Sequence, residues 1–214
     1  MTDIRIVKHK CAVCGAVNDY FAIMSTNTFG GGPDLDLRPA EMQRSTMHAW
    51  LQACPECGYV SSNIEDPMHL PKEYLQSEEY LSCEGIDFKS DLAKVFYRHY
   101  MICYENDMIS DAFNSVLHAA WACDDEGDYN NAVRCRNISI ELADELIEQR
   151  NNIMLIKADL MRRTGQFSEL IKEYSDVRFN TEIMDDILSF QIEKAKAEDT
   201  DCYRLEDVIT DGQE

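Results

Sequence analysis

Residues 109–121 read ISDAFNSVLHAAW. Apolar side chains recur there at intervals of three and four, which predicts a helix with one continuous apolar stripe and an end near Gly127. The stripe consists of Ile109, Ala112, Phe113, Val116, Leu117, Ala120 and Trp121. Because such a stripe must be covered by other apolar surface, we expect this helix to pack against neighbouring helices.

Similar amphipathic patterns surround that stretch. They predict helices over residues 72–82, 88–105, 129–148, 152–163, 167–178 and 182–196. The loops between them are too short for anything but antiparallel neighbours. All five prolines and six of the nine glycines lie before residue 86, so the helix breakers end where the helical patterns begin. We therefore expect an array of helical hairpins over residues 71–214.

A weak internal repeat supports this array. At Gly127 and again at Gly165 a predicted helix stops, and an aromatic residue, Tyr129 or Phe167, follows two residues later. The two copies are offset by 38 residues. The arrangement resembles tetratricopeptide-like helical hairpins, whose helices need neighbours to cover their apolar faces. The resemblance implies helix pairs that stack in a row.

The first 70 residues have a different composition. Short β-leaning runs at residues 4–7, 20–24 and 47–53 are separated by the turn signal GGGP at residues 30–33. We expect a small sheet in this part, built around four cysteines, and a boundary to the helical part near residues 66–71. The predicted fold class is α+β, mainly α, with a β module at 1–70 and a helical domain at 71–214.

The cysteines carry the most specific signal. CAVCG at residues 11–15 and CPECGY at residues 54–59 are two CxxC pairs, with 39 residues between Cys14 and Cys54. Two intervening residues let one tight turn present both sulfurs to a tetrahedral metal, and the glycine after each pair can adopt a positive φ. Cys11, Cys14, Cys54 and Cys57 are therefore the predicted metal ligands. The other five cysteines lack paired spacing and indicate reduced, mostly buried thiols.

The identity of the metal is open at this point. Four thiolates suit Zn²⁺, they also suit a single iron, and CxxC pairs also serve as thiol/disulfide couples. Our interpretation is structural zinc, because a closed set of four ligands leaves no position for water or substrate. The sequence also lacks a P-loop, a GxSxG elbow and an HExxH helix. We therefore expect a protein that is not an enzyme.

The loop DLDLRP at residues 34–39 is a second candidate site. Asp34 and Asp36 alternate in an extended segment and would face one side, as a pair of catalytic carboxylates does. The structural alternative is that Asp34, Asp36 and Arg38 tie the loop together and order the insertion between the cysteine pairs. We prefer the structural interpretation and keep these three residues as a possible functional loop.

Charge limits the partners. The chain has 20 Lys and Arg against 40 Asp and Glu, a net charge of −20, of which residues 71–214 contribute −17. A nucleic acid or an anionic membrane would be repelled, whereas a protein with a basic surface is compatible. Surplus acid also serves solubility alone. The charged first ten residues and the lack of a long apolar run predict a cytoplasmic protein.

The order of these motifs resembles a bacterial family described as a domain of unknown function. The resemblance rests on CxxCG, then DxDLRP, then CPxCGY, followed by an all-helical tail, and it covers residues 11–60 best. It implies a zinc-ribbon-like head fused to a tetratricopeptide-like tail. We expect a cytoplasmic zinc protein that acts as an interaction or adaptor module. The alternative is a rubredoxin-like electron-transfer or thiol-redox protein that uses the same cysteines, since the second pair is also similar to rubredoxin.

Overall fold

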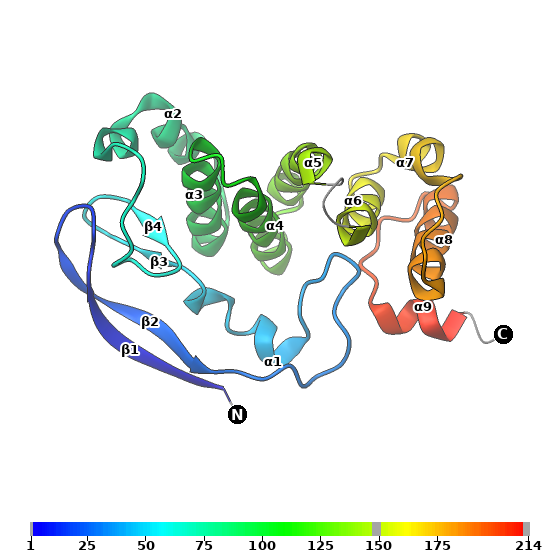
Figure 1. Ribbon diagram of the computed structural model, residues 1–214, viewed down its shortest axis with the longest axis horizontal. Helices are drawn as coiled ribbons and strands as arrows, with labels where there is room; N and C mark the ends of the chain where they lie inside the picture. Colours follow the sequence, from blue (N-terminus) through cyan, green and yellow to red (C-terminus); the bar gives the residue numbers. More distant parts are fainter. Residues whose placement is uncertain (1, 147–150, 212–214) are drawn as a thin grey trace.

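A computed structural model describes residues 2–146 and 151–211 of the chain (Figure 1). It confirms an α+β fold that is mainly α. The strands are β1 (Asp3–Lys10), β2 (Val17–Ser25), β3 (Gln52–Ala53) and β4 (Val60–Ser61). The α-helices are α1 (Glu41–Arg44), α2 (Glu78–Leu81), α3 (Asp91–Glu105), α4 (Ile109–Asp125), α5 (Tyr129–Leu146), α6 (Asn151–Arg163), α7 (Phe167–Tyr174), α8 (Glu182–Lys196) and α9 (Leu205–Asp211). Among the described residues, no helix is both long and apolar enough to cross a bilayer.

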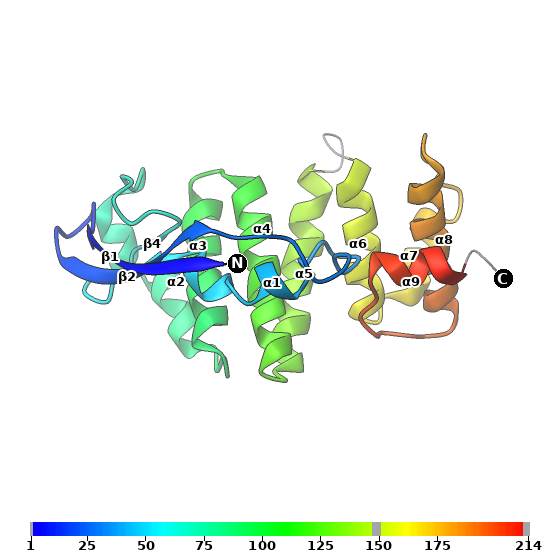
Figure 2. The same cartoon turned by 90° about the horizontal axis from the view of Figure 1, so that it is seen from below.

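Helices α3 to α8 stand side by side in a row (Figure 1). Each of α3, α4 and α5 packs on the next helix, and α6 packs on both α7 and α8. One side of the row, called the covered side below, carries the β1–β2 hairpin, α1 and α9. Figure 2 looks at this side and shows the chain between β2 and α1 running across the helices.

The stripe predicted on α4 forms the centre of the core. Phe113, Val116, Leu117 and Trp121 are each at most 3% exposed and belong to one apolar cluster that reaches from α3 to α8. The alanines of α4 have no exposed surface at Ala112, Ala119 and Ala120, which lets α3 and α5 approach closely. The helical array is therefore built around α4.

The weak repeat proves to be a repeated helix cap. Gly127 and Gly165 lie in the left-handed region, with φ of 62° and 77°. The next residue donates its backbone N–H to the carbonyl five positions back, Asp128 to Cys123 and Gln166 to Met161, both at 2.8 Å. Asp107 has the same conformation after α3, with φ of 56°.

Two predicted elements differ from the structure. Residues 47–53 were expected as a strand, but Met47–Ala49 is a 3₁₀ turn and only Gln52–Ala53 is a strand. The Thr46 hydroxyl accepts a hydrogen bond from the Trp50 indole at 2.8 Å and closes that turn. Residues 72–82 were expected as one helix, but Ser77 is extended and splits them into the 3₁₀ turn Lys72–Gln76 and α2. Its hydroxyl caps α2 by accepting from the Tyr80 N–H.

The β1–β2 hairpin is antiparallel and faces the cysteines with one side. Residues Val7 and Tyr20 are register partners on that inward side, and Tyr20 is buried. Ile6 and Phe21 are partners on the opposite side, where Ile6 is 67% exposed. The strands therefore alternate between an inner and an outer face, as an antiparallel pair with one covered face does.

The long connection between β2 and α1 is joined to the end of the chain. Residues 33–38, called the covering segment below, pair with the stretch before α9: Leu35 donates its N–H to the Tyr203 carbonyl at 2.9 Å, and Leu205 donates to the Pro33 carbonyl at 3.1 Å. The Leu35 side chain is buried in a small apolar cluster with α8 and α9. The covered side of the helical row is thus lined by the protein's own chain.

Candidate metal centre

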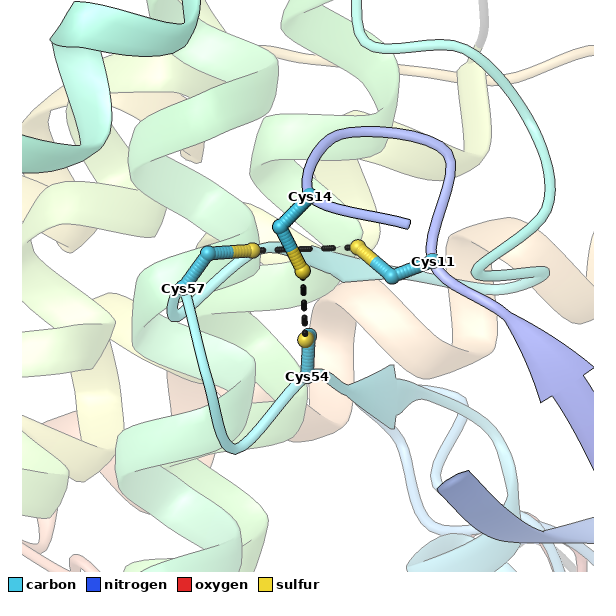
Figure 3. Close-up of side chains that lie close together, drawn as sticks. All are labelled: Cys11, Cys14, Cys54 and Cys57. Atoms are coloured by element: carbon cyan, nitrogen blue, oxygen red, sulfur yellow. Dashed lines mark hydrogen bonds between the residues drawn. The ribbon is translucent and has the colours of Figure 1, made fainter. Parts of the chain in front are cut away.

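The four predicted ligands come together at one point (Figure 3). The Sγ atoms of Cys11 and Cys57 are 3.7 Å apart, and those of Cys14 and Cys54 are 3.6 Å apart. All four sulfurs lie within 4.8 Å of one another. Each short distance joins one CxxC turn to the other, so neither turn forms a site alone.

These distances fit a metal tetrathiolate. With metal–sulfur bonds of about 2.3 Å, the edge of a sulfur tetrahedron is about 3.8 Å, whereas a disulfide needs about 2.05 Å. The observed 3.6 and 3.7 Å match the tetrahedral edge and are far from a disulfide. The four cysteines could therefore hold a metal ion.

The two CxxC turns have the same backbone geometry. The N–H of Gly15 donates to the Cys11 carbonyl at 2.9 Å, and the N–H of Gly58 donates to the Cys54 carbonyl at 3.0 Å. Both glycines have a φ of 77°, a conformation that side chains with a Cβ rarely adopt. The glycine after each pair is therefore required by the turn that points the two sulfurs the same way.

Burial raises the pKa of the Cys11 and Cys57 thiols, whereas the surroundings of Cys54 favour negative charge on its sulfur. Burial alone would raise the pKa of the Cys54 thiol, but the backbone N–H groups of Cys57 and Glu56 point at the sulfur and hold the pKa below its usual value. The buried Tyr20 hydroxyl lies beside Cys54 and makes no hydrogen bond of good geometry within the described residues. An orphaned buried donor next to sulfur is what a thiolate of a metal centre would accept from.

The centre connects the hairpin to the helical part. Cys11 follows β1, whereas Cys54 follows β3, and both are buried in a cluster that also contains Tyr80 of α2 and Ile102 of α3. The Tyr80 hydroxyl donates to the Gly58 carbonyl at 2.6 Å. A metal at this point would therefore fasten the hairpin, the β3–β4 turn and the first helices together.

Asp36 of the candidate loop lies at the bottom of a buried polar network. Its side chain is fully buried and accepts from the Trp121 indole at 2.7 Å and from Arg163 at 2.9 Å. Burial raises the pKa of Asp36, and the nearby Arg163 guanidinium opposes that rise. Arg163 also pairs with Asp124 at 2.9 Å.

Asp34 and Arg38 have partners of their own. Asp34 is buried and pairs with Arg44 at 2.7 Å, and Arg38 is buried and pairs with Asp125 of α4 at 2.5 Å. The two carboxylates of the loop thus bind different cations rather than pointing at one common position. Their contacts hold the covering segment to α1, α4 and α6.

Sequence reasoning missed the partners of this segment. Trp121 was read only as a core residue, and Arg163 drew no attention, although both bind Asp36. The one available signal was Arg162-Arg163 at the end of an otherwise apolar helical pattern, since paired arginines on a buried helix need acidic partners.

Fold and site together define a mainly helical α+β protein with a cluster of four cysteines that could hold a metal ion. Comparison of the chain with protein-family models, with curated proteins and with solved structures gives no match.

Proposed function

We propose that the cysteine cluster binds one structural Zn²⁺ through the thiolates of Cys11, Cys14, Cys54 and Cys57. The observation that supports this most directly is the size of the sulfur cluster, with its 3.6 and 3.7 Å edges. Zinc has no redox chemistry and no geometric preference beyond the tetrahedron, so it suits a closed thiolate set whose task is to hold parts of the chain together.

Elemental analysis of protein purified without added metal, with a visible spectrum of the same sample, tests the zinc site. We expect one zinc per chain and no visible absorption. The Cys57→Ser variant should lose the metal, and Cys202→Ser, which changes an exposed thiol outside the cluster, should keep it. Iron with a reducible chromophore would instead favour electron transfer, and metal retained in Cys57→Ser would refute the ligand set.

We further propose that the protein is an interaction module whose partner has a basic surface. Residues 71–214 hold 15 basic and 32 acidic residues. Four of those cations form ion pairs with carboxylates and have side chains that are at most 9% exposed: Arg136, Lys157, Arg162 and Arg163. The surface of the helical row therefore carries a large excess of acidic groups, which steers basic partners toward it.

Charge variants on α5 test this proposal. Glu141 and Glu145 are exposed and lie one turn apart. Partners captured by wild-type protein in low salt should bind less to Glu141→Gln/Glu145→Gln and least to Glu141→Lys/Glu145→Lys, because each step removes negative charge. Capture that is equal for all three proteins, or that persists unchanged at high salt, would contradict a basic partner at this surface.

A further inference from the structure

An open pocket of about 530 Å³ lies on the covered side, between α4 and the connection from β2 to α1. One wall is formed by the connection, with Thr28 and Leu37. The other wall is formed by Trp50 and by the α4 residues His118 and Trp121. The volume falls in the range of about 300 to 1,000 Å³ that is typical of pockets for small molecules.

Three aromatic rings line the α4 wall. The His118 ring lies between the indoles, with its centroid 4.9 Å from that of Trp50 and 4.6 Å from that of Trp121. Both indole N–H groups are already used, by Thr46 at 2.8 Å and by Asp36 at 2.7 Å. Trp50 and His118 are half-buried, so part of each ring is accessible from the pocket.

Uncharged polar side chains surround these rings without partners of their own. Thr28, Gln43, Asn114 and His118 line the pocket, and none makes a side-chain hydrogen bond to another residue in the part of the chain that the structure describes. Thr28 and Asn114 are exposed, and Gln43 and His118 are half-buried. The four side chains are therefore free to bind a ligand.

The pocket has no charge to offer. No acidic residue, lysine or arginine is among the described residues that line it. Burial lowers the pKa of His118 to about 3, so its imidazole is neutral and supplies one donor and one acceptor nitrogen. Asp36 and Arg38 next to it are bound to other side chains. A charged ligand would lose its hydration without gaining a counter-charge.

The covering segment closes one end of the open pocket. Residues 33–38 fill the covered side toward α6 and α9, so an extended peptide could not continue in that direction. Leu37 of this segment has a φ of 66°, and its side chain, which lines the pocket, is 50% exposed. A ligand that covers Leu37 would bury apolar surface that the folded chain leaves in water.

We propose that this pocket binds an uncharged, planar heteroaromatic molecule about the size of a nucleoside. Its ring stacks on Trp50 and meets His118 at an edge, because the two protein rings are inclined by 72°. Its donor and acceptor edge bonds to the amides of Asn114 and Gln43, which present the matching pair of groups. The pocket lies apart from the cysteine cluster, so this inference does not depend on the metal.

Intrinsic fluorescence provides a direct test, because Trp50 and Trp121 are the only two tryptophans of the chain and both line the pocket. Adenosine, guanosine and uridine are titrated with excitation at a wavelength that only indole absorbs. At least one nucleoside should change the emission saturably with a Kd below about 1 mM. Its 5′-monophosphate should bind at least about tenfold more weakly, because the phosphate meets no cation in a chain of net charge −20.

Substitutions in the pocket test where the nucleoside binds. Asn114→Leu removes the amide, and His118→Phe keeps the ring contacts but removes the nitrogens. Each substitution should weaken the binding of the nucleoside by about tenfold. Asn130→Leu changes an exposed asparagine of α5 outside the pocket and should bind like wild type. No saturable change with any nucleoside, monophosphates that bind as tightly, or unchanged affinity in Asn114→Leu would each overturn the proposal.

Discussion

Asp36 holds the covering segment in place through its carboxylate. It is fully buried, and its two strongest partners come from α4 and α6. Removing its charge would leave the Arg163 guanidinium with one fewer counter-charge in a site that water does not reach. The cost of such an unbalanced buried charge is larger than that of most surface substitutions.

Asp36→Asn should therefore lower the free energy of unfolding by about 3 kcal/mol, because one partner of a buried ion pair is lost while the shape of the side chain is kept. Urea denaturation measures this change. Asp19→Asn, on the exposed face of β2, serves as the control and should change stability by less than about 0.5 kcal/mol. Equal effects of the two substitutions would show that the buried network does not hold the segment.

Two histidines make the stability depend on pH. Burial lowers the pKa of His99 to about 4 and that of His118 to about 3, below the ordinary value of 6.5. Between these lowered pKa values and pH 6.5, the histidines of the unfolded chain bind protons that those of the folded chain do not. Stability should therefore be complete above pH 6.5 and fall as the pH drops, by about 1.4 kcal/mol per pH unit for each histidine.

Urea denaturation between pH 7 and pH 5 measures this slope, in a range where carboxylates contribute little. His118→Phe keeps an aromatic ring against Trp50 and removes one of the two titrating groups, so its slope should be about half that of wild type. A wild-type stability that is flat across this range would mean that both histidines titrate in the folded protein with the same pKa as in the unfolded chain.

At the scale of elements, helix ends obey a rule that the sequence only partly reveals. Within residues 2–146 and 151–211, four helices end with a residue in the left-handed region: Asp107 after α3, Gly127 after α4, Gly165 after α6 and Glu198 after α8. In each case the following N–H binds the carbonyl five positions back. Two of these caps could be predicted from the sequence because they contain glycine. The caps at Asp107 and Glu198 could not, because neither residue type is typical of a C-terminal helix cap.

Substitutions at these caps should act in opposite directions. Asp107→Gly should stabilise the protein by about 0.5 to 1 kcal/mol, because glycine has no Cβ that opposes a positive φ, and Gly127→Ala should destabilise it by about 1 kcal/mol. Thermal unfolding compares the two. Gly85→Ala is the matched control, since Gly85 has no positive φ and open space around its Cα. Stability changes of the same sign for Asp107→Gly and Gly127→Ala would contradict the left-handed caps at these two positions.

The helices and the clustering of the four cysteines were predictable for a physical reason. Helix periodicity and the CxxC spacing are local patterns, and residues 109–121 and 11–14 carry them within a few turns of chain. The 3₁₀ turn at Met47–Ala49 was not predictable in this way, because Met47 is held by apolar contacts with the helical core. A run that favours a strand locally became a turn once tertiary packing decided its backbone.

On the scale of the whole molecule, the contacts that shape the covered side connect distant parts of the chain. Asp36 is 85 residues from Trp121 and 127 residues from Arg163. No local pattern links such positions, so the sequence offered Asp34, Asp36 and Arg38 as a candidate loop but not the helices that they bind. The four cysteines were the exception, because one metal requires both pairs.

Metal removal should unfold one part of the molecule before the rest. The cysteines belong to an apolar cluster with the hairpin and α2, and the helical row has its own larger cluster around α4. A strong chelator should therefore expose the hairpin to proteolysis and hydrogen exchange while most of the helical circular dichroism remains. Complete loss of the helical signal at the same chelator concentration would show that the two clusters unfold as one unit.

The pairing of residues 33–38 with the stretch just before α9 has a consequence for synthesis. Gly32, beside this segment, donates its N–H to Glu206, 174 residues further on. At ribosomal speeds of about 5 to 20 residues per second, the earlier segment of this contact waits about 9 to 35 seconds for its partner to be made. Until then the nascent chain must keep a charged aspartate and an apolar Leu35 in water, so this part of the fold closes only after residues 203–206 have been synthesised.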